Sequence, residues 1–117
     1  MWIFTKEGFF SAVISPEYCK EGEIAVRARN RDDLHQLIDC LDTQGCAAQI
    51  IDTPQADYCS RVIIPKAFWV QYVADAADRI DYDNFKNATT SDDDLRHTAY
   101  FGCWSSLYKW QNELLDR

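Results

Sequence analysis

The sequence predicts an α+β domain in which helices cover one face of an antiparallel sheet. Its first 65 residues consist mostly of short apolar runs and alternating stretches, which are typical of strands. Apolar residues spaced three and four apart indicate helices in three places, and strands and helices do not alternate regularly. We expect a ferredoxin-like core with an N-terminal hairpin and an extra C-terminal helix, all within a single domain over residues 1–117.

The N-terminal segment predicts a hairpin followed by a third strand. Two apolar runs, "WIFT" (2–5) and "FFSAVI" (9–14), flank a short polar stretch. That stretch ends at Gly8, a residue that tolerates the positive φ of a tight turn. The next run, "EIAVRAR" (23–29), alternates, so every second side chain points to the same face of a strand.

A first helix is expected over residues 31–41. Asn30 is a favourable N-cap, and Asp33 stands at the position that completes a capping box. Gly45 lies just beyond the C-terminal end, where glycine readily accepts the left-handed conformation. The inner stripe of this helix consists of Leu34, Leu37, Ile38 and Leu41.

Two further strands and a second helix follow. The strands are "AAQIID" (47–52) and "SRVIIP" (60–65), which are joined by a polar connection. Pro65 suits the first turn of a helix over residues 66–80, because that turn leaves its amide groups unpaired and proline has none. The core face of this helix is expected to contain Trp69, Tyr72, Val73, Ala76 and Ile80.

A last helix is expected from about Ser91 almost to Arg117. Ser91 is a good N-cap, and Asp94 then occupies the third helical position. Acidic residues in this first turn favour the positive end of the helix dipole. The central apolar stripe consists of Tyr100, Cys103, Trp104, Leu107, Trp110 and Leu114.

The apolar stripe of this last helix is wider than packing on one sheet requires. Phe101, Tyr108 and Leu115 extend it to roughly half of the circumference at 100° per residue. Either neighbouring helices absorb the excess or another protein chain does, since exposed aromatic patches usually mark interaction sites. We therefore single out these three residues as partner-binding candidates, and a two-fold homodimer is one way to cover their row.

The composition limits the classes of partner. The formal net charge is −7 and the isoelectric point is near 4.6, which disfavours nonspecific contact with nucleic acid and with anionic membranes. The same charge either attracts a basic protein partner or serves only solubility. No apolar run approaches the roughly 20 residues that span a bilayer. We expect neither nucleic acid nor a membrane as a binding partner.

The cysteines and the first residues indicate the compartment. The five cysteines are Cys19, Cys40, Cys46, Cys59 and Cys103. Their number is odd and no pair has CxxC spacing, so neither a zinc ribbon nor a thioredoxin-like motif is supported. The start, "MWIFTKEGFF", lacks the basic region and the long apolar stretch of a signal peptide. We expect a cytoplasmic protein with reduced thiols.

The segment "IDYDNFKN" (80–87) interrupts the helical pattern. Asp81 and Asp83 fit the first two ligand positions of a calcium loop, but Phe85 stands where an acid is needed and Lys86 replaces the glycine. Asp and Asn also favour chain reversals, because their side chains bond nearby backbone groups. We favour a structural reversal, with a binding loop as the alternative, and expect no metal site.

Arg27, Arg29 and Arg31 form the sharpest local charge feature. On a strand, Arg27 and Arg29 share a face beside a helix N-terminus, an arrangement that suits phosphate or another anion. The alternative, which we favour, is a solvated strand face whose arginines pair with Asp32, Asp33 or other acids.

The two histidines do not by themselves indicate a catalytic centre. His35 falls on the polar side of its helix. His97 would need Cys59 or Cys103 in contact to form a Cys–His pair, and spacing alone does not establish such contact. The sequence has no Walker loop, and four glycines do not form a dinucleotide-binding fingerprint. We expect no catalytic residue and no cofactor.

Three sequence blocks occur in order before the aromatic last helix: "GFFSAV", "IAVRARNRDDLHQL" and "IDYDNFKNA". In these blocks the chain resembles a widespread family of small uncharacterised bacterial proteins. The resemblance implies a bacterial, cytosolic, single-domain protein and brings no catalytic residue with it. The chain departs from that family in its final third, where "SDDDLRHTAYFGC" replaces a more basic, alanine-rich link, so partner contacts there are expected to differ.

The leading function hypothesis is a small acidic protein-interaction or regulatory module without catalytic activity. Its grounds are the negative charge, the wide aromatic helix and the lack of a catalytic motif. Immunity proteins, phage-encoded inhibitors and regulatory adaptors all share this description. The alternative, from another class, is a small-ligand or phosphate-binding protein or enzyme that uses the arginine cluster.

Overall fold

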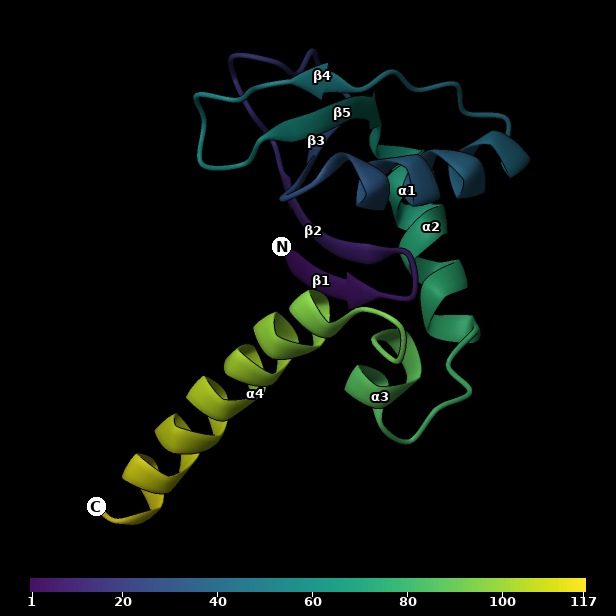
Figure 1. The fold of residues 1–117 in the computed structure, drawn as a ribbon. Helices are drawn as coiled ribbons and strands as arrows, with labels where there is room; N and C mark the ends of the chain where they lie inside the picture. The colour runs from purple at the N-terminus through teal and green to yellow at the C-terminus, as the bar shows by residue number, and fades with distance from the viewer. The chain divides into compact units, whose positions relative to one another are not determined.

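A computed structural model describes residues 1–117, which divide into two compact units, residues 1–80 and residues 81–117 (Figure 1). The first unit contains β1 (Trp2–Thr5), β2 (Gly8–Val13), β3 (Glu23–Ala28), α1 (Arg31–Thr43), β4 (Ile51–Asp52), β5 (Ser60–Pro65) and α2 (Lys66–Asp78). The second contains α3 (Phe85–Thr89) and α4 (Asp94–Leu115). The single domain that chain length predicts stays a prediction.

The five strands of the first unit form one antiparallel sheet in the order β1-β2-β3-β5-β4. Helix α1 connects β3 to β4 along the chain, and β5 lies between these two strands in the sheet. This is the split βαβ arrangement of ferredoxin-like folds. The place on the other side of β3 is taken by β2 of the N-terminal hairpin. The predicted α+β class, with helices packed on an antiparallel sheet, is confirmed.

The core of this unit lies between one sheet face and the helices α1 and α2. Alternate residues of the three central strands, such as Phe10, Val26 and Ile64, are buried there. Helix α1 contributes Leu34, Leu37 and Leu41, as its spacing predicts, and α2 contributes Trp69 and Tyr72. The ring of Phe10 meets those of Trp69 and Tyr72 edge to face, at centroid distances of 6.3 and 6.2 Å.

Two predicted elements of the first unit are shorter than expected. The strand predicted over residues 47–52 pairs only at Ile51 and Asp52. The apolar side chains before it, Ala48 and Ile50, pack against the core without joining the ladder, so their hydrophobicity reflects burial and not strand pairing. Helix α2 ends at Asp78, and Ile80, predicted on its core face, is exposed because it lies beyond the last turn.

The start of α4 also differs from the prediction. The N-cap is Asp93, whose side chain accepts a hydrogen bond from the amide of Arg96 at 2.9 Å, and not Ser91. A carboxylate satisfies the free amide of the first turn and also carries the charge that the helix dipole favours. Asp94 is therefore the first helical residue instead of the third. The predicted end close to Arg117 is confirmed, because the helix runs to Leu115.

Helix α1 is anchored to the hairpin through Asp33. Asn30 caps the helix as predicted and accepts from the Asp33 amide at 2.8 Å. The buried side chain of Asp33 accepts from the amide of Phe9 at 3.0 Å. Gly8 makes room for this contact: its φ is +150°, and a Cβ there would lie 2.2 Å from Asp33 Cγ. The chain therefore needs glycine at the point where the hairpin passes α1.

Replacing Asp33 by alanine tests this anchor. The change leaves the Phe9 amide without its charged acceptor, a loss of about 2 kcal/mol of unfolding free energy. Asp32→Ala is the matched control, because Asp32 lies in the same helical turn and is exposed. Urea unfolding at neutral pH should give a clearly larger loss for Asp33→Ala. Equal losses in the two variants would show that the acceptor at Phe9 contributes nothing.

Candidate functional site

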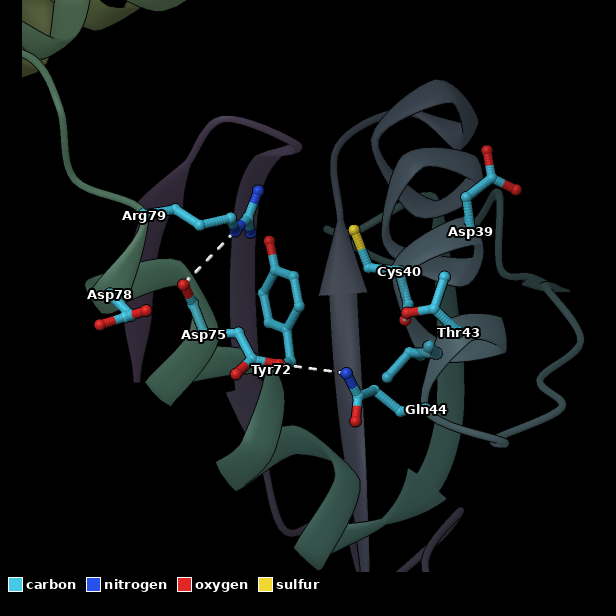
Figure 2. A pocket seen from close by; sticks show the side chains of 9 residues that line it. Asp39, Cys40, Thr43, Gln44, Tyr72, Asp75, Asp78 and Arg79 are labelled. Atoms are coloured by element: carbon cyan, nitrogen blue, oxygen red, sulfur yellow. Dashed lines mark hydrogen bonds between the residues drawn. The ribbon is translucent and has the colours of Figure 1, made fainter.

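A pocket of about 400 Å³ lies between α1 and α2 in the first unit (Figure 2). This volume falls within the usual range for small-ligand sites. Helix α1 lines it on one side and α2, with the residue that follows it, on the other. The lining residues are Asp39, Cys40, Leu41, Thr43, Gln44, Tyr72, Asp75, Asp78 and Arg79.

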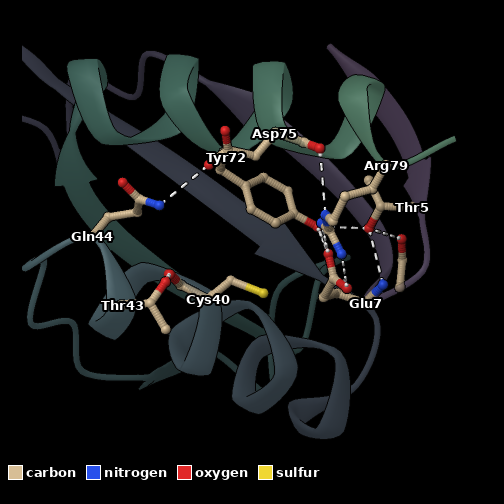
Figure 3. A network of polar contacts seen from close by, with 9 residues as sticks. Thr5, Glu7, Cys40, Thr43, Gln44, Tyr72, Asp75 and Arg79 are labelled. Atoms are coloured by element: carbon tan, nitrogen blue, oxygen red, sulfur yellow. Dashed lines mark hydrogen bonds and ion pairs between the residues drawn. The ribbon is translucent and has the colours of Figure 1, made fainter.

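A network of polar contacts forms one end of this pocket (Figure 3). Tyr72 extends from α2 and donates its phenolic hydrogen to Glu7 Oε1 at 2.7 Å. Because that hydrogen is committed, the 2.7 Å contact between Tyr72 and Thr5 has Thr5 Oγ1 as its donor. Arg79 binds the same carboxylate with both ends of its guanidinium, at 2.7 and 3.1 Å. The network thus joins the β1–β2 turn to the end of α2.

The network fixes the protonation states of its members. Burial alone would raise the pKa of Glu7, but hydrogen bonds from Arg79 and Tyr72 and the charge of Arg79 together lower it below its usual value. Burial, and then the neighbouring Glu7, raises the pKa of Tyr72 far above that of a free phenol. The hydrogen bond to Glu7 raises the pKa of Arg79. At neutral pH the site therefore holds a carboxylate, a neutral phenol and a guanidinium.

Cys40 is the thiol within the pocket lining. Burial raises its pKa, and the negative charge of Glu7 raises it further. A thiol becomes a nucleophile or a metal ligand as the thiolate, which forms where positive groups lower the pKa. The pocket therefore favours the protonated thiol of Cys40 at neutral pH.

The mouth of the pocket is acidic. Asp39, Asp75 and Asp78 line it, while the one guanidinium, that of Arg79, is neutralised by Glu7. Gln44, the residue that follows α1, donates to Asp75 of α2 at 3.3 Å and so links the two helices. The arrangement has an excess of negative charge and can accommodate a cationic group, and it repels an anion.

The sequence did not single out this pocket. Glu7 and Arg79 are 72 positions apart, and Tyr72 was expected only as a core residue. The one available signal was the polar end of a predicted buried tyrosine, because a buried phenol usually needs a hydrogen-bond partner. That signal indicates that a partner exists and does not identify Glu7.

Of the three predicted anion-binding residues, Arg27 and Arg29 contact the same aromatic ring, while Arg31 has a different partner. The guanidinium carbons of Arg27 and Arg29 both lie over the ring of Tyr58, at 4.4 and 3.9 Å from its centre. Arg27 also donates to Ser11 Oγ at 2.7 Å, and Arg29 to the carbonyl of Asp57 at 2.5 Å. Arg31 instead forms an ion pair with Asp52. Anion binding by these three residues stays a prediction.

Within residues 1–80, Cys40 is the cysteine that lines the pocket. His35 is exposed on α1, and His97 Nδ1 shares a hydrogen bond with Thr90 Oγ1 at 2.8 Å. The five cysteines are all free thiols. No group of three or more His, Cys, Asp or Glu side chains is arranged to hold a metal ion.

The segment "IDYDNFKN" begins the second unit and leads into α3. Asn84 caps α3 by accepting from the amide of Asn87 at 3.1 Å. The ring of Phe85 stacks on that of Tyr100 of α4, with centroids 6.1 Å apart, and Tyr82 packs against Phe85 at 5.4 Å. These contacts pack the segment within the second unit, and its role as a structural reversal or a binding loop stays a prediction.

The predicted partner-binding residues Phe101, Tyr108 and Leu115 are all exposed on α4. Phe101 packs beside Trp104 with ring centres 5.6 Å apart, and Trp104 stacks on Tyr108 at 5.0 Å with an angle of 7°. Within this unit, the short helix α3 is the element that packs on α4, and Tyr100 is the buried residue of α4. Most of the apolar side of α4 is therefore exposed.

Comparisons of the chain with protein-family models, curated proteins and solved structures found no match. The resemblance to a family of small bacterial proteins therefore stays a prediction. None of the helices is both long enough and apolar enough to cross a membrane.

Replacing Glu7 by glutamine tests the charge state of the pocket network. The folded protein lowers the pKa of Glu7, so its carboxylate adds stability above the unfolded pKa of about 4.3 and loses this contribution as pH falls through the lower folded value. Wild type should therefore lose more unfolding free energy than Glu7→Gln when urea unfolding is repeated from pH 6 down to about pH 3. Glu17→Gln, at an exposed carboxyl, should behave like wild type. A pH slope shared by all three proteins would rule out the ionised network.

Proposed function

We propose that the chain is a protein-binding module that acts without catalysis, and that its binding surface is the exposed apolar side of α4. We name this surface the aromatic arc. It consists of Phe101, Cys103, Trp104, Leu107, Tyr108, Trp110, Leu114 and Leu115. At 100° per residue these side chains lie on one half of the helix, with the uncharged Gln111 among them, and Lys109 and Glu113 lie on the other half.

The exposure of the aromatic arc is the observation that carries the proposal. Leu107 is 62% exposed, Trp110 59% and Leu115 73%. Single exposed apolar residues are normal on protein surfaces, but a contiguous patch of this size usually marks a binding site. Burying it in an interface is favourable in proportion to the apolar area removed from water.

The chemistry of the arc supports a protein partner. Tryptophan and tyrosine are enriched among residues that dominate binding energy at protein interfaces, and the arc contains two tryptophans and a tyrosine. Stacking of Trp104 on Tyr108 also holds both rings in place before binding. An ordered ring loses less conformational entropy when a partner covers it.

The state of the pocket supports a role without catalysis. The thiol of Cys40 is protonated, the phenol of Tyr72 has a raised pKa, and the carboxylate of Glu7 is held in an ion pair. Each is in a state unsuited to nucleophilic or acid–base work at neutral pH. The network instead serves to hold α2 against the hairpin.

Site-specific photo-crosslinking tests the proposed surface. A benzophenone amino acid is placed at position 108, within the arc, and in a control protein at position 106, on the opposite half of α4. Irradiation in cells that express the protein at its natural level should give a protein adduct from position 108 and little or none from position 106. Mass spectrometry identifies the adduct. No protein adduct from the arc, with a tightly bound metabolite in the purified protein, would contradict the proposal.

A further inference from the structure

We infer that the partner covering the aromatic arc is a second copy of this chain, paired with the first about a two-fold axis. The inference rests on the proposed function, because it names one occupant of the same surface. In such a dimer each arc contacts the equivalent arc, so the surface must be complementary to itself. Three properties of the arc meet this requirement: its area, its lack of charge and its spacing along α4.

The area of the arc matches that of a stable dimer. Aromatic side chains bury about 150–250 Å² each when fully covered. Since the arc residues are about half exposed, they offer on the order of 700 Å² per copy. Standard protein interfaces bury about 800 Å² per partner, so two arcs together reach the usual range. A small contact on this surface would leave much of the apolar area in water.

The arc carries no charge. Between Thr98 and Leu115 the charged residues are Lys109 and Glu113, and both lie on the opposite half of α4. An interface with a strongly charged partner would need charges to pair with, and the arc has none to offer. A second arc is uncharged as well. The nearest charge is the ammonium of Lys86, 5.4 Å from the ring centre of Trp104, and its long flexible side chain can turn that charge to solvent when two arcs meet.

The spacing of the arc fits helix pairing. Residues spaced three and four apart along the middle of the arc repeat as the a and d positions of a helix–helix seam do: Trp104, Leu107, Gln111 and Leu114. Gln111 is the one polar residue among them. Towards the N-terminus the seam ends where Phe85 of α3 stacks on Tyr100. The open part, from Cys103 to Leu114, is about 16 Å long at 1.5 Å per residue. A seam this short relies on its aromatic side chains for anchoring.

Salt distinguishes self-pairing from binding of a basic partner. Each copy has a net charge of −7, so two copies repel one another at long range while the uncharged arcs attract at contact. Added salt screens the repulsion, since the Debye length falls to about 8 Å at physiological ionic strength. Self-association should therefore strengthen as the salt concentration rises. Binding of a basic partner should instead weaken, because salt screens the attraction between opposite charges.

Analytical ultracentrifugation of the full chain tests the inference. We expect a dimer in equilibrium with monomer at micromolar concentration, with the dimer fraction rising when sodium chloride is raised from low to physiological levels. Tyr108→Gln combined with Leu115→Gln should shift the equilibrium at least tenfold towards a folded monomer. The matched control is Ser106→Gln combined with Glu113→Gln, which introduces glutamine one heptad apart on the opposite half of α4 and should leave the dimer intact.

A second variant guards against misfolding. Leu107→Lys places one charge at the centre of the arc and should also give a monomer, with the far-UV circular dichroism and urea unfolding midpoint of wild type. A wild type that is monomeric at all salt concentrations would overturn the inference. So would outright unfolding of the double variant and of Leu107→Lys, because the arc would then belong to the core of the monomer.

The two proposals fail in different ways. If position 108 crosslinks to another protein while the chain sediments as a monomer, the inference is wrong and the proposed function stands. If position 108 gives no protein adduct and the chain is a monomer, both are wrong. An adduct between two copies of the chain supports both.

Discussion

Tyr72 joins the hydrophobic core of residues 1–80 to the polar network of its pocket. Its ring packs on Phe10 and Trp69, and its hydroxyl bonds to Glu7. A buried phenol is costly without a hydrogen-bond partner, so the turn between β1 and β2 must keep Glu7 in reach. Glu7 in turn holds Arg79 just beyond the end of α2. Tyr72 therefore ties the end of α2, and with it the pocket between α1 and α2, to the hairpin.

A different constraint governs residues 81–117. A helix that is apolar over half of its circumference needs neighbours along its whole length, and α3 spans only Phe85–Thr89. It covers Tyr100 and reaches Trp104 through Lys86, whose ammonium lies 5.4 Å from the ring centre. The remaining turns of α4 keep an apolar side that residues 81–117 do not cover. We propose that another chain covers it.

Local signals in the sequence were sufficient for much of the fold. Asn30 and Gly45 mark the ends of α1 because cap positions require particular side chains or a positive φ, here +82° at Gly45. The spacing of apolar residues correctly predicted the buried side of α1 and the bounds of β5. It was wrong at residues 47–50, where apolar side chains serve the core without strand pairing. Burial on its own does not distinguish these two uses of an apolar run.

The pocket could not be predicted from local pattern. Its network joins residues from the first hairpin and from α2, and only the folded sheet brings them together. For the arginines, strand periodicity predicted only which side chains share a face. Arg27 and Arg29 do lie on one face, and both contact the ring of Tyr58. Neither that ring nor the ion pair of Arg31 with Asp52 could be predicted from the alternation. Helix geometry was sufficient to place the apolar residues of α4 on one side, but it did not determine that this side is exposed.

Hydroxyl-radical footprinting tests most directly whether the aromatic arc is an intermolecular surface. Oxidation of Trp104, Tyr108 and Trp110 is compared with that of the buried Trp69 and Tyr72 at nanomolar and at high micromolar protein concentrations. The account predicts that the arc rings are oxidised in dilute protein and protected in concentrated protein, while the core rings are protected in both. Protection of the arc rings at every concentration would contradict it, because the arc would then be covered within one chain.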